Sequence, residues 1–185
     1  MAVLLIGKNF VEGTDDSREC IYKTPKNLKN LLYYHYTNAQ FIITSPELYE
    51  PYNYDSQADI IFDQFMYYQN CCNKNLYTRA LHYILLFRMD EKYHGNAACK
   101  TEAEIAMTFY KICGDLRDLL CGNILPGHQR MFFFYHDFTL MRIDIIANPV
   151  HIDSLDVCTT EAGFRIFLDQ LKDVTDQNSY MIIGQ

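Results

Sequence analysis

The residues best suited to chemistry lie in one apolar stretch of the chain, residues 128–150. This stretch reads HQRMFFFYHDFTLMRIDIIANPV and is the most apolar and aromatic part of the sequence. It nevertheless carries side chains that can bind a metal ion, move a proton or hold an anion: His128, His136, Asp137, Arg142 and Asp144. Polar groups inside an apolar element cost free energy unless they are paired. The stretch therefore predicts either a functional site or an ion pair formed inside the protein.

Two strands and a short turn are expected to position these side chains. Met131–His136 is apolar and aromatic, which favours a buried strand. Met141–Ala147 alternates, so Arg142 and Asp144 are expected on one face of a second strand. The four residues between the strands make the turn. Asn148-Pro149 is predicted to end the second strand, because Pro cannot donate to a strand ladder.

A second candidate site is the basic segment near the start of the chain. Between Arg18 and Asn38 there are four basic residues and one acidic residue, and tyrosines are interleaved with Lys23, Lys26 and Lys29. Lysines suit a nucleic-acid backbone and aromatic rings suit its bases, so the segment predicts a nucleic-acid contact. The alternative interpretation is a solvated loop followed by an aromatic strand that faces the core.

The remaining segments predict an α+β fold with a central, largely antiparallel sheet and helices packed on it. Amphipathic spacing indicates helices over residues 57–69, 101–121 and 160–176. Apolar runs indicate strands over residues 2–6 and 39–44, within 77–88, and over 180–183. The length predicts a single domain spanning residues 1–185.

The composition of the chain argues against some classes of function and favours others. The formal net charge of -7 argues against a general nucleic-acid binder, although a local basic groove is compatible with it. The seven cysteines form no CxxC motif, and no secretory pattern is visible at the N-terminus, so we expect reduced thiols and a cytoplasmic protein. No apolar run reaches the length of a membrane span, so no membrane contact is expected.

Three segments, taken in order, resemble the relaxase domain of plasmid mobilisation proteins, which nick DNA at a transfer origin. Tyr22-Lys23-Thr24-Pro25-Lys26 is similar to the family segment that holds a nucleophilic tyrosine. His82–Arg88 is similar to a family strand with the pattern His-x-x-x-Ser-Phe. His128-Gln129-Arg130, the two strands after it and Asn148 resemble the family's metal-binding unit. The resemblance covers roughly residues 18–150 and implies a relaxase-like fold.

The metal positions depart from the family pattern. The family holds a divalent metal with three histidines on the two strands, and the metal polarises the phosphate that the tyrosine attacks. Ungapped alignment places Tyr135, Arg142 and Asp144 at these positions, and arginine cannot ligate because it stays protonated. One interpretation is that the metal site is lost and Arg142 pairs with Asp144. A second is a rearranged magnesium or manganese site that uses His136 and Asp144, with Asp137 or His151. A third is that the chain resembles the family in its fold alone and that these polar groups face solvent.

The resemblance thus implies a degenerate relaxase-like protein of a mobile genetic element. It would bind single-stranded DNA or an accessory transfer protein without metal-dependent nicking, and would need no cofactor. The residues expected to contact DNA are Lys23, Lys26, Lys29, Arg130 and Arg142. The alternatives are an active relaxase with altered metal ligands, in which Tyr22 is the nucleophile, and a protein–protein interaction module on the same scaffold.

Overall fold

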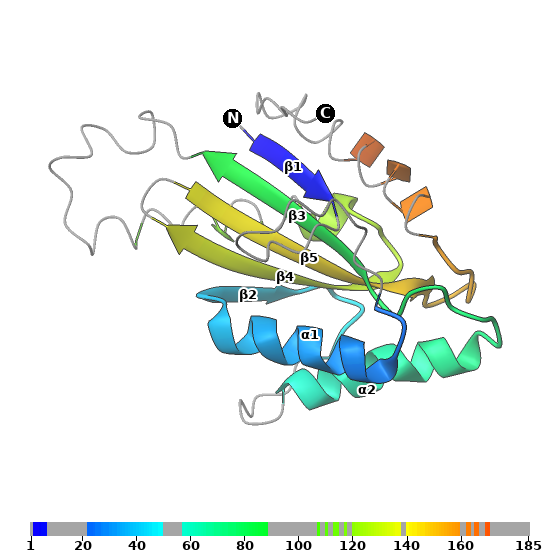
Figure 1. The fold of residues 1–185 in the computed structure, drawn as a ribbon. Helices are drawn as coiled ribbons and strands as arrows, with labels where there is room; N and C mark the ends of the chain where they lie inside the picture. The colour runs from blue at the N-terminus through cyan, green and yellow to red at the C-terminus, as the bar shows by residue number, and fades with distance from the viewer. Residues whose placement is uncertain are drawn as a thin grey trace, which may run out of the picture.

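A computed structural model describes residues 2–6, 22–49, 57–88, 120–137 and 140–159, together with single residues between 107 and 117 and between 162 and 170. Five strands form one antiparallel sheet in the order β1-β3-β5-β4-β2 (Figure 1). The strands are β1 (Ala2–Ile6), β2 (Phe41–Thr44), β3 (Leu81–Arg88), β4 (His128–Asp137) and β5 (Leu140–His151). Helices α1 (Pro25–Asn38) and α2 (Gln57–Cys71) lie against one face of the sheet. The predicted α+β fold is confirmed.

The alternating side chains of the strands build two cores, one on each face of the sheet. On the α1 and α2 face, Met131, Phe133 and Ile146 pack with leucines of α1 and with Ile61 and Phe65 of α2. On the opposite face the core is formed by the intervening strand residues and by helical residues of the 107–124 region, including Cys113 and Leu120. No helix among the described residues is both long and apolar enough to span a bilayer.

The β4–β5 hairpin confirms the predicted strand pair, but its second strand is longer than expected. Asp137 pairs with Leu140, so only residues 138 and 139, which lie outside the described residues, connect the strands. Pro149 does not end β5, which continues to His151. The register shifts there, so that Asn148, Pro149 and Val150 face the single residue Gln129. Proline is tolerated at such a bulge because no ladder hydrogen bond is required of it.

The basic segment adopts neither a loop nor a strand after Tyr22-Lys23, since residues 25–38 form α1. Thr24 caps the helix: its hydroxyl accepts from the Asn27 amide, and Asn27 accepts from the Thr24 amide, while Pro25 occupies the first turn. A capping residue followed by proline is a strong helix start. The predicted aromatic strand is therefore wrong, because local capping decides the conformation.

The other described elements match their predictions. The strands predicted over 2–6, 39–44 and 77–88 are found as β1, β2 and β3, and the helix predicted over 57–69 is α2. The described residues within the predicted helices 101–121 and 160–176 are helical. The strand predicted over 180–183 lies outside the described residues.

Candidate functional site

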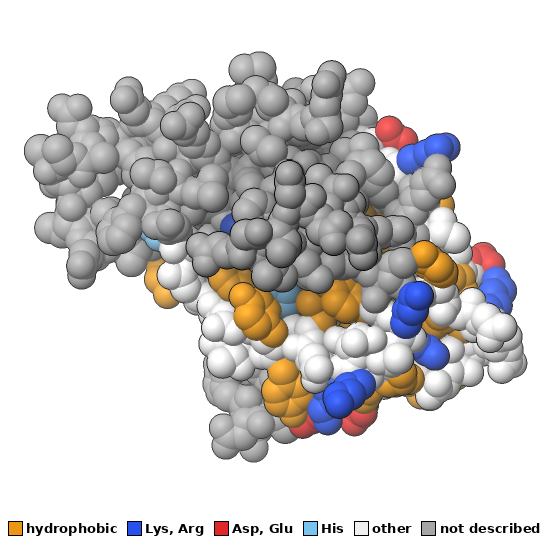
Figure 2. Space-filling model, in the orientation of Figure 1, with side chains coloured by type: hydrophobic (Ala, Val, Ile, Leu, Met, Phe, Trp, Pro, Cys, Tyr) orange, Lys and Arg blue, Asp and Glu red, His pale blue; other side chains and the backbone are white. Residues whose placement is uncertain are grey.

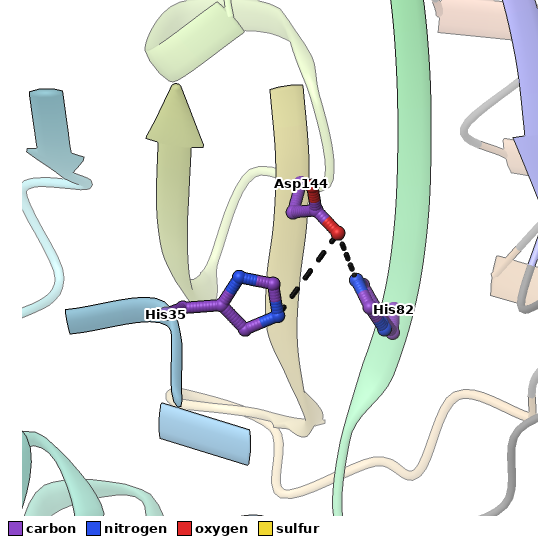
Figure 3. Close-up of side chains that lie close together, drawn as sticks. All are labelled: His35, His82 and Asp144. Atoms are coloured by element: carbon purple, nitrogen blue, oxygen red, sulfur yellow. Dashed lines mark hydrogen bonds and ion pairs between the residues drawn. The ribbon is translucent and has the colours of Figure 1, made fainter. Parts of the chain in front are cut away.

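The candidate site lies on the face of the sheet that α1 and α2 cover. The alternation of the strands places His82 of β3, Tyr135 of β4 and both Arg142 and Asp144 of β5 on this face. The buried side of α1 adds His35, and Tyr22 joins from the segment just before the helix. Figure 3 shows His35 and His82 pointing toward Asp144 from α1 and β3.

Asp144 is the centre of the cluster, and its side chain is completely buried. Its Oδ1 accepts hydrogen bonds from His82 Nε2 and Arg142 Nη2, both at 2.7 Å, and its Oδ2 accepts from Arg142 Nε at 2.5 Å. Burial alone would raise the pKa of the Asp144 carboxyl, but the hydrogen bonds from His82 and Arg142 outweigh burial and lower it. Asp144 is therefore an anion held by fixed donors.

His82 connects Asp144 to Tyr22. An ionised carboxylate only accepts hydrogen bonds, so His82 Nε2 carries the proton that faces Asp144. The other ring nitrogen, Nδ1, lies 2.7 Å from the Tyr22 hydroxyl and, in the neutral imidazole, accepts a hydrogen bond from it. A tyrosine hydroxyl, an imidazole and a carboxylate in series form an arrangement in which the imidazole can act as a base toward the hydroxyl.

His35 approaches Asp144 from the helix side. Its Nε2 lies 4.0 Å from Asp144 Oδ1, and its Nδ1 lies 2.5 Å from the Tyr135 hydroxyl. Its ring stacks on Phe133, with the centroids 5.0 Å apart. Burial lowers the pKa of His35 to about 3, so the imidazole is neutral at pH 7 and its lone pair is available.

Arg142 is one of the cluster members that reach solvent, together with Tyr22 and Tyr135, which are also partly exposed. Its side chain is 32% exposed, whereas its partner Asp144 is fully buried. Its guanidinium carbon lies 5.4 Å from the centroid of the Tyr135 ring, within the range of a cation–π contact. Nη1 of Arg142 has no hydrogen-bond partner among the described residues. Arg142 therefore closes the cluster on its open side.

The structure brings several sequence-predicted residues together. Tyr22, Tyr135, Arg142 and Asp144 all belong to this one cluster. The predicted pairing of Arg142 with Asp144, and their placement on one face, are confirmed. His136 lies outside the cluster that could hold a metal, and the side chain of Asp137 is outside the described part of the structure.

The residues predicted to contact DNA fall into different surroundings. Lys23 and Lys26 are exposed at the start of α1, whereas Lys29 forms an ion pair of 2.7 Å with Asp59 of α2. Arg130 is buried, and both Nη2 bonds of its guanidinium go to Glu47. The prediction that Arg130 contacts DNA is therefore wrong, because its donors are used inside the protein.

Sequence reasoning missed the role of His35 and placed His82 in an apolar strand, where a core histidine with satisfied hydrogen bonds is expected. A helical pattern would have revealed His35, because it follows Leu28, Leu31 and Leu32 on the buried side of α1. His82 is indeed buried and bonded, but its partners are the predicted nucleophile and the central carboxylate.

His35, His82 and Asp144 offer three ligand atoms that lie within 4.8 Å of one another. Two neutral imidazoles and a carboxylate are a donor set that transition-metal ions accept. Comparisons with protein-family models, curated proteins and solved structures found no match for this chain.

Proposed function

We propose that this protein is relaxase-like and binds single-stranded DNA over the α1 side of its sheet, without cleaving it through a metal ion. The observation that supports the proposal is the convergence of Tyr22 and Arg142, which meet through His82 and Asp144 although they lie far apart in the sequence. These are the residues that the resemblance assigns to the nucleophile and to a metal position. An accessory transfer protein is a further partner under this proposal.

The chemistry around Arg142 suits a nucleic-acid strand. A guanidinium that keeps unused donors and reaches solvent can hold a phosphate oxygen while it pairs with Asp144. Tyr34 offers an exposed ring for a base: it is 58% exposed, and its ring contacts His35 edge-on at 5.2 Å. Lysine or arginine side chains lie beside hydrophobic ones over the region of α1 and α2 (Figure 2). A phosphate contact next to a stacking ring is a common mode of single-strand binding.

The proposal that the protein does not cleave DNA through a metal ion rests on the hydrogen bonds of Asp144. Both of its oxygens accept hydrogen bonds from Arg142, and one also accepts from His82. A cation that used this carboxylate would have to displace a guanidinium, which carries the same sign of charge. In the state with Arg142 bound, the cluster therefore holds Tyr22 without a metal to polarise a phosphate.

Fluorescence anisotropy with a labelled oligothymidine tests the proposal. We expect salt-dependent binding that weakens in Arg142→Ala and, by about 1–3 kcal/mol, in Tyr34→Ala, the range typical of a stacked base. Tyr77→Ala is the matched control, because Tyr77 is similarly exposed but lies in the segment between α2 and β3. Absence of salt-dependent binding would favour the protein–protein interaction module instead.

A second candidate function is cleavage by Tyr22, and the bond from Tyr22 to His82 favours it. His82 is held by Asp144 in the tautomer that can accept the tyrosine proton, which is the arrangement of an activated nucleophile. Incubation with a labelled random pool of single-stranded DNA should then give a covalent complex that survives denaturation. The complex should be lost in Tyr22→Phe. If no such complex forms, with or without divalent metal, cleavage by Tyr22 is excluded.

A further inference from the structure

We infer that His35, His82 and Asp144 form a zinc-binding site that Arg142 covers and competes for. This inference concerns metal binding alone, so it stands or falls separately from DNA binding. The three ligands come from α1, β3 and β5, whereas the resemblance implied ligands from the hairpin strands only. Two of the three ligands therefore lie outside the hairpin.

The positions of the ligand atoms require only small shifts to hold an ion. Tetrahedral zinc with bonds of about 2.0–2.2 Å keeps its ligand atoms about 3.3 Å apart. His82 Nε2 lies 2.7 Å from Asp144 Oδ1 and His35 Nε2 lies 4.0 Å from it. Of these two distances, one must open and the other must close, each by less than about 1 Å. The two histidine ligand atoms lie within 4.8 Å of one another and must also approach. Both histidines present Nε2 toward the carboxylate, and Figure 3 shows the two rings pointing toward Asp144.

The residues around the three ligands already make the hydrogen bonds that a metal site requires. Histidines that bind a metal through Nε2 use Nδ1 for a second hydrogen bond, which fixes the orientation of the ring. His35 Nδ1 is bonded to the Tyr135 hydroxyl, and His82 Nδ1 is bonded to the Tyr22 hydroxyl. When zinc takes Nε2 of His82, the ring proton resides on Nδ1 and points at Tyr22. Zinc binding therefore also reverses the hydrogen bond made by Tyr22.

Arg142 controls access to this site. The three ligands are almost completely buried, and the Arg142 side chain is the partly exposed group that contacts Asp144. Zinc adds two positive charges to one carboxylate and two neutral imidazoles, so the guanidinium is repelled and must leave Asp144. Its departure opens a path to the ligands and frees its donors for another anion. Arg142 and zinc are thus alternative partners of the same carboxylate.

The donor set selects the class of metal. Imidazole nitrogens suit zinc and its neighbours in the first transition row, whereas magnesium prefers oxygen ligands and keeps several waters. With two nitrogens and one buried carboxylate, the site should take zinc or cobalt and discriminate against magnesium. Three protein ligands leave the fourth tetrahedral position for water or a phosphate oxygen.

Metal titrations of the chelator-treated protein test the inference. We expect the wild type to bind one equivalent of Zn²⁺, with no response to Mg²⁺. His35→Phe keeps the ring that stacks on Phe133 but removes the ligand atom, so affinity should fall at least about hundredfold. Arg142→Ala removes the competitor and should bind Zn²⁺ about tenfold more tightly, because hydrogen bonds to charged groups no longer have to be broken. His136→Ala is the matched control and should bind like the wild type.

Cobalt distinguishes this site from zinc bound to the seven cysteines. Co²⁺ in the proposed site should give visible absorption without the intense sulfur-to-metal charge-transfer band of thiolate ligation. The inference is overturned if neither the wild type nor Arg142→Ala binds Zn²⁺, if the cobalt spectrum shows thiolate ligation alone, or if His136→Ala weakens binding as much as His35→Phe. Should Arg142→Ala fail to fold, the comparison of His35→Phe with His136→Ala still decides the question.

Discussion

The β4–β5 hairpin carries two arginine–carboxylate pairs that are built in opposite ways. Near the start of β4, the arginine is the buried partner: the Arg130 side chain is 1% exposed and its partner Glu47 is 16% exposed. Near the start of β5, the carboxylate is the buried partner: Asp144 is completely buried and Arg142 is 32% exposed. The Arg142 pair is bidentate, with Nε and Nη2 each bonded to one oxygen of Asp144, whereas Nη2 of Arg130 alone donates to both oxygens of Glu47.

The two pairs differ in whether the arginine can move away from its carboxylate partner. Arg130 also donates to the carbonyl oxygens of His128 and Ile124, so its departure would remove a donor from two buried carbonyl groups. Arg142 donates to Asp144, and His82 remains on that carboxylate when Arg142 moves away. We conclude that the first pair is a structural cross-link, whereas the second pair can exchange its arginine for another cation.

The largest expected effect on stability is that of breaking the pair of Arg130 and Glu47. Arg130→Ala should lower the free energy of unfolding by about 3–5 kcal/mol, the usual cost of removing one partner of a buried ion pair. Urea denaturation followed by circular dichroism measures this change. A loss below about 1 kcal/mol, as at exposed ion pairs, would mean that Arg130 is not a structural cross-link.

Arg142→Ala should cost less, about 1–3 kcal/mol, the penalty for leaving a buried acceptor partly unsatisfied. The cost is smaller because His82 still donates to Asp144 and solvent can enter where the guanidinium stood. The same urea experiment applies. If Arg142→Ala destabilises the protein as much as Arg130→Ala does, the distinction between the two pairs fails.

Acid should weaken the Arg130 pair. Burial by itself raises the pKa of Glu47, but hydrogen bonds from Ser45 and Arg130 outweigh burial and lower the pKa below its usual value. The folded-state pKa lies below the unfolded one, so the stabilisation is complete above about pH 4.5 and is lost as the pH falls through the folded-state pKa. The difference in unfolding free energy between the wild type and Glu47→Gln should therefore shrink below pH 4.5. A constant difference down to pH 3 would contradict this assignment.

The smallest effect on stability is expected at Tyr22, which lies at the edge of the cluster around Asp144. Tyr22→Phe removes the hydroxyl that bonds His82 and should cost about 1 kcal/mol of unfolding free energy. Tyr77→Phe is a suitable control, because Tyr77 is exposed in the segment before β3. Equal effects of the two substitutions would show that the bond between Tyr22 and His82 contributes nothing to stability.

Local sequence patterns predicted the hairpin and one side of its site. Alternation in β5 places Arg142 and Asp144 on one face, and their pairing is one of the three interpretations that the sequence leaves open; the structure contains this pair. The pattern could not reveal Glu47 as the partner of Arg130, because the turn after β2 meets β4 only through the sheet. Arg130 was therefore assigned to a DNA surface that it does not reach.

The helical half of the site was missed for a different reason. Neither interpretation of the lysines and tyrosines over residues 22–38, a nucleic-acid contact or a loop followed by a strand, includes the buried stripe of α1 that ends in His35. The capping signal at Thr24 and Pro25 was the local evidence for the helix. The approach of His35 to Asp144 depends on the packing of α1 against the sheet, which no local pattern specifies.

The most direct test of the account is whether zinc and DNA are coupled through Arg142. Anisotropy with a labelled oligothymidine should show tighter binding when saturating Zn²⁺ releases Arg142 from Asp144, by about fivefold or more if the coupling is of ordinary size. The gain should vanish in Arg142→Ala, which has no guanidinium to release, and in His35→Phe, which lacks a zinc ligand. Unchanged affinity in the wild type, or an equal gain in Arg142→Ala, would contradict the claim that the release of Arg142 from Asp144 frees further donors for a phosphate.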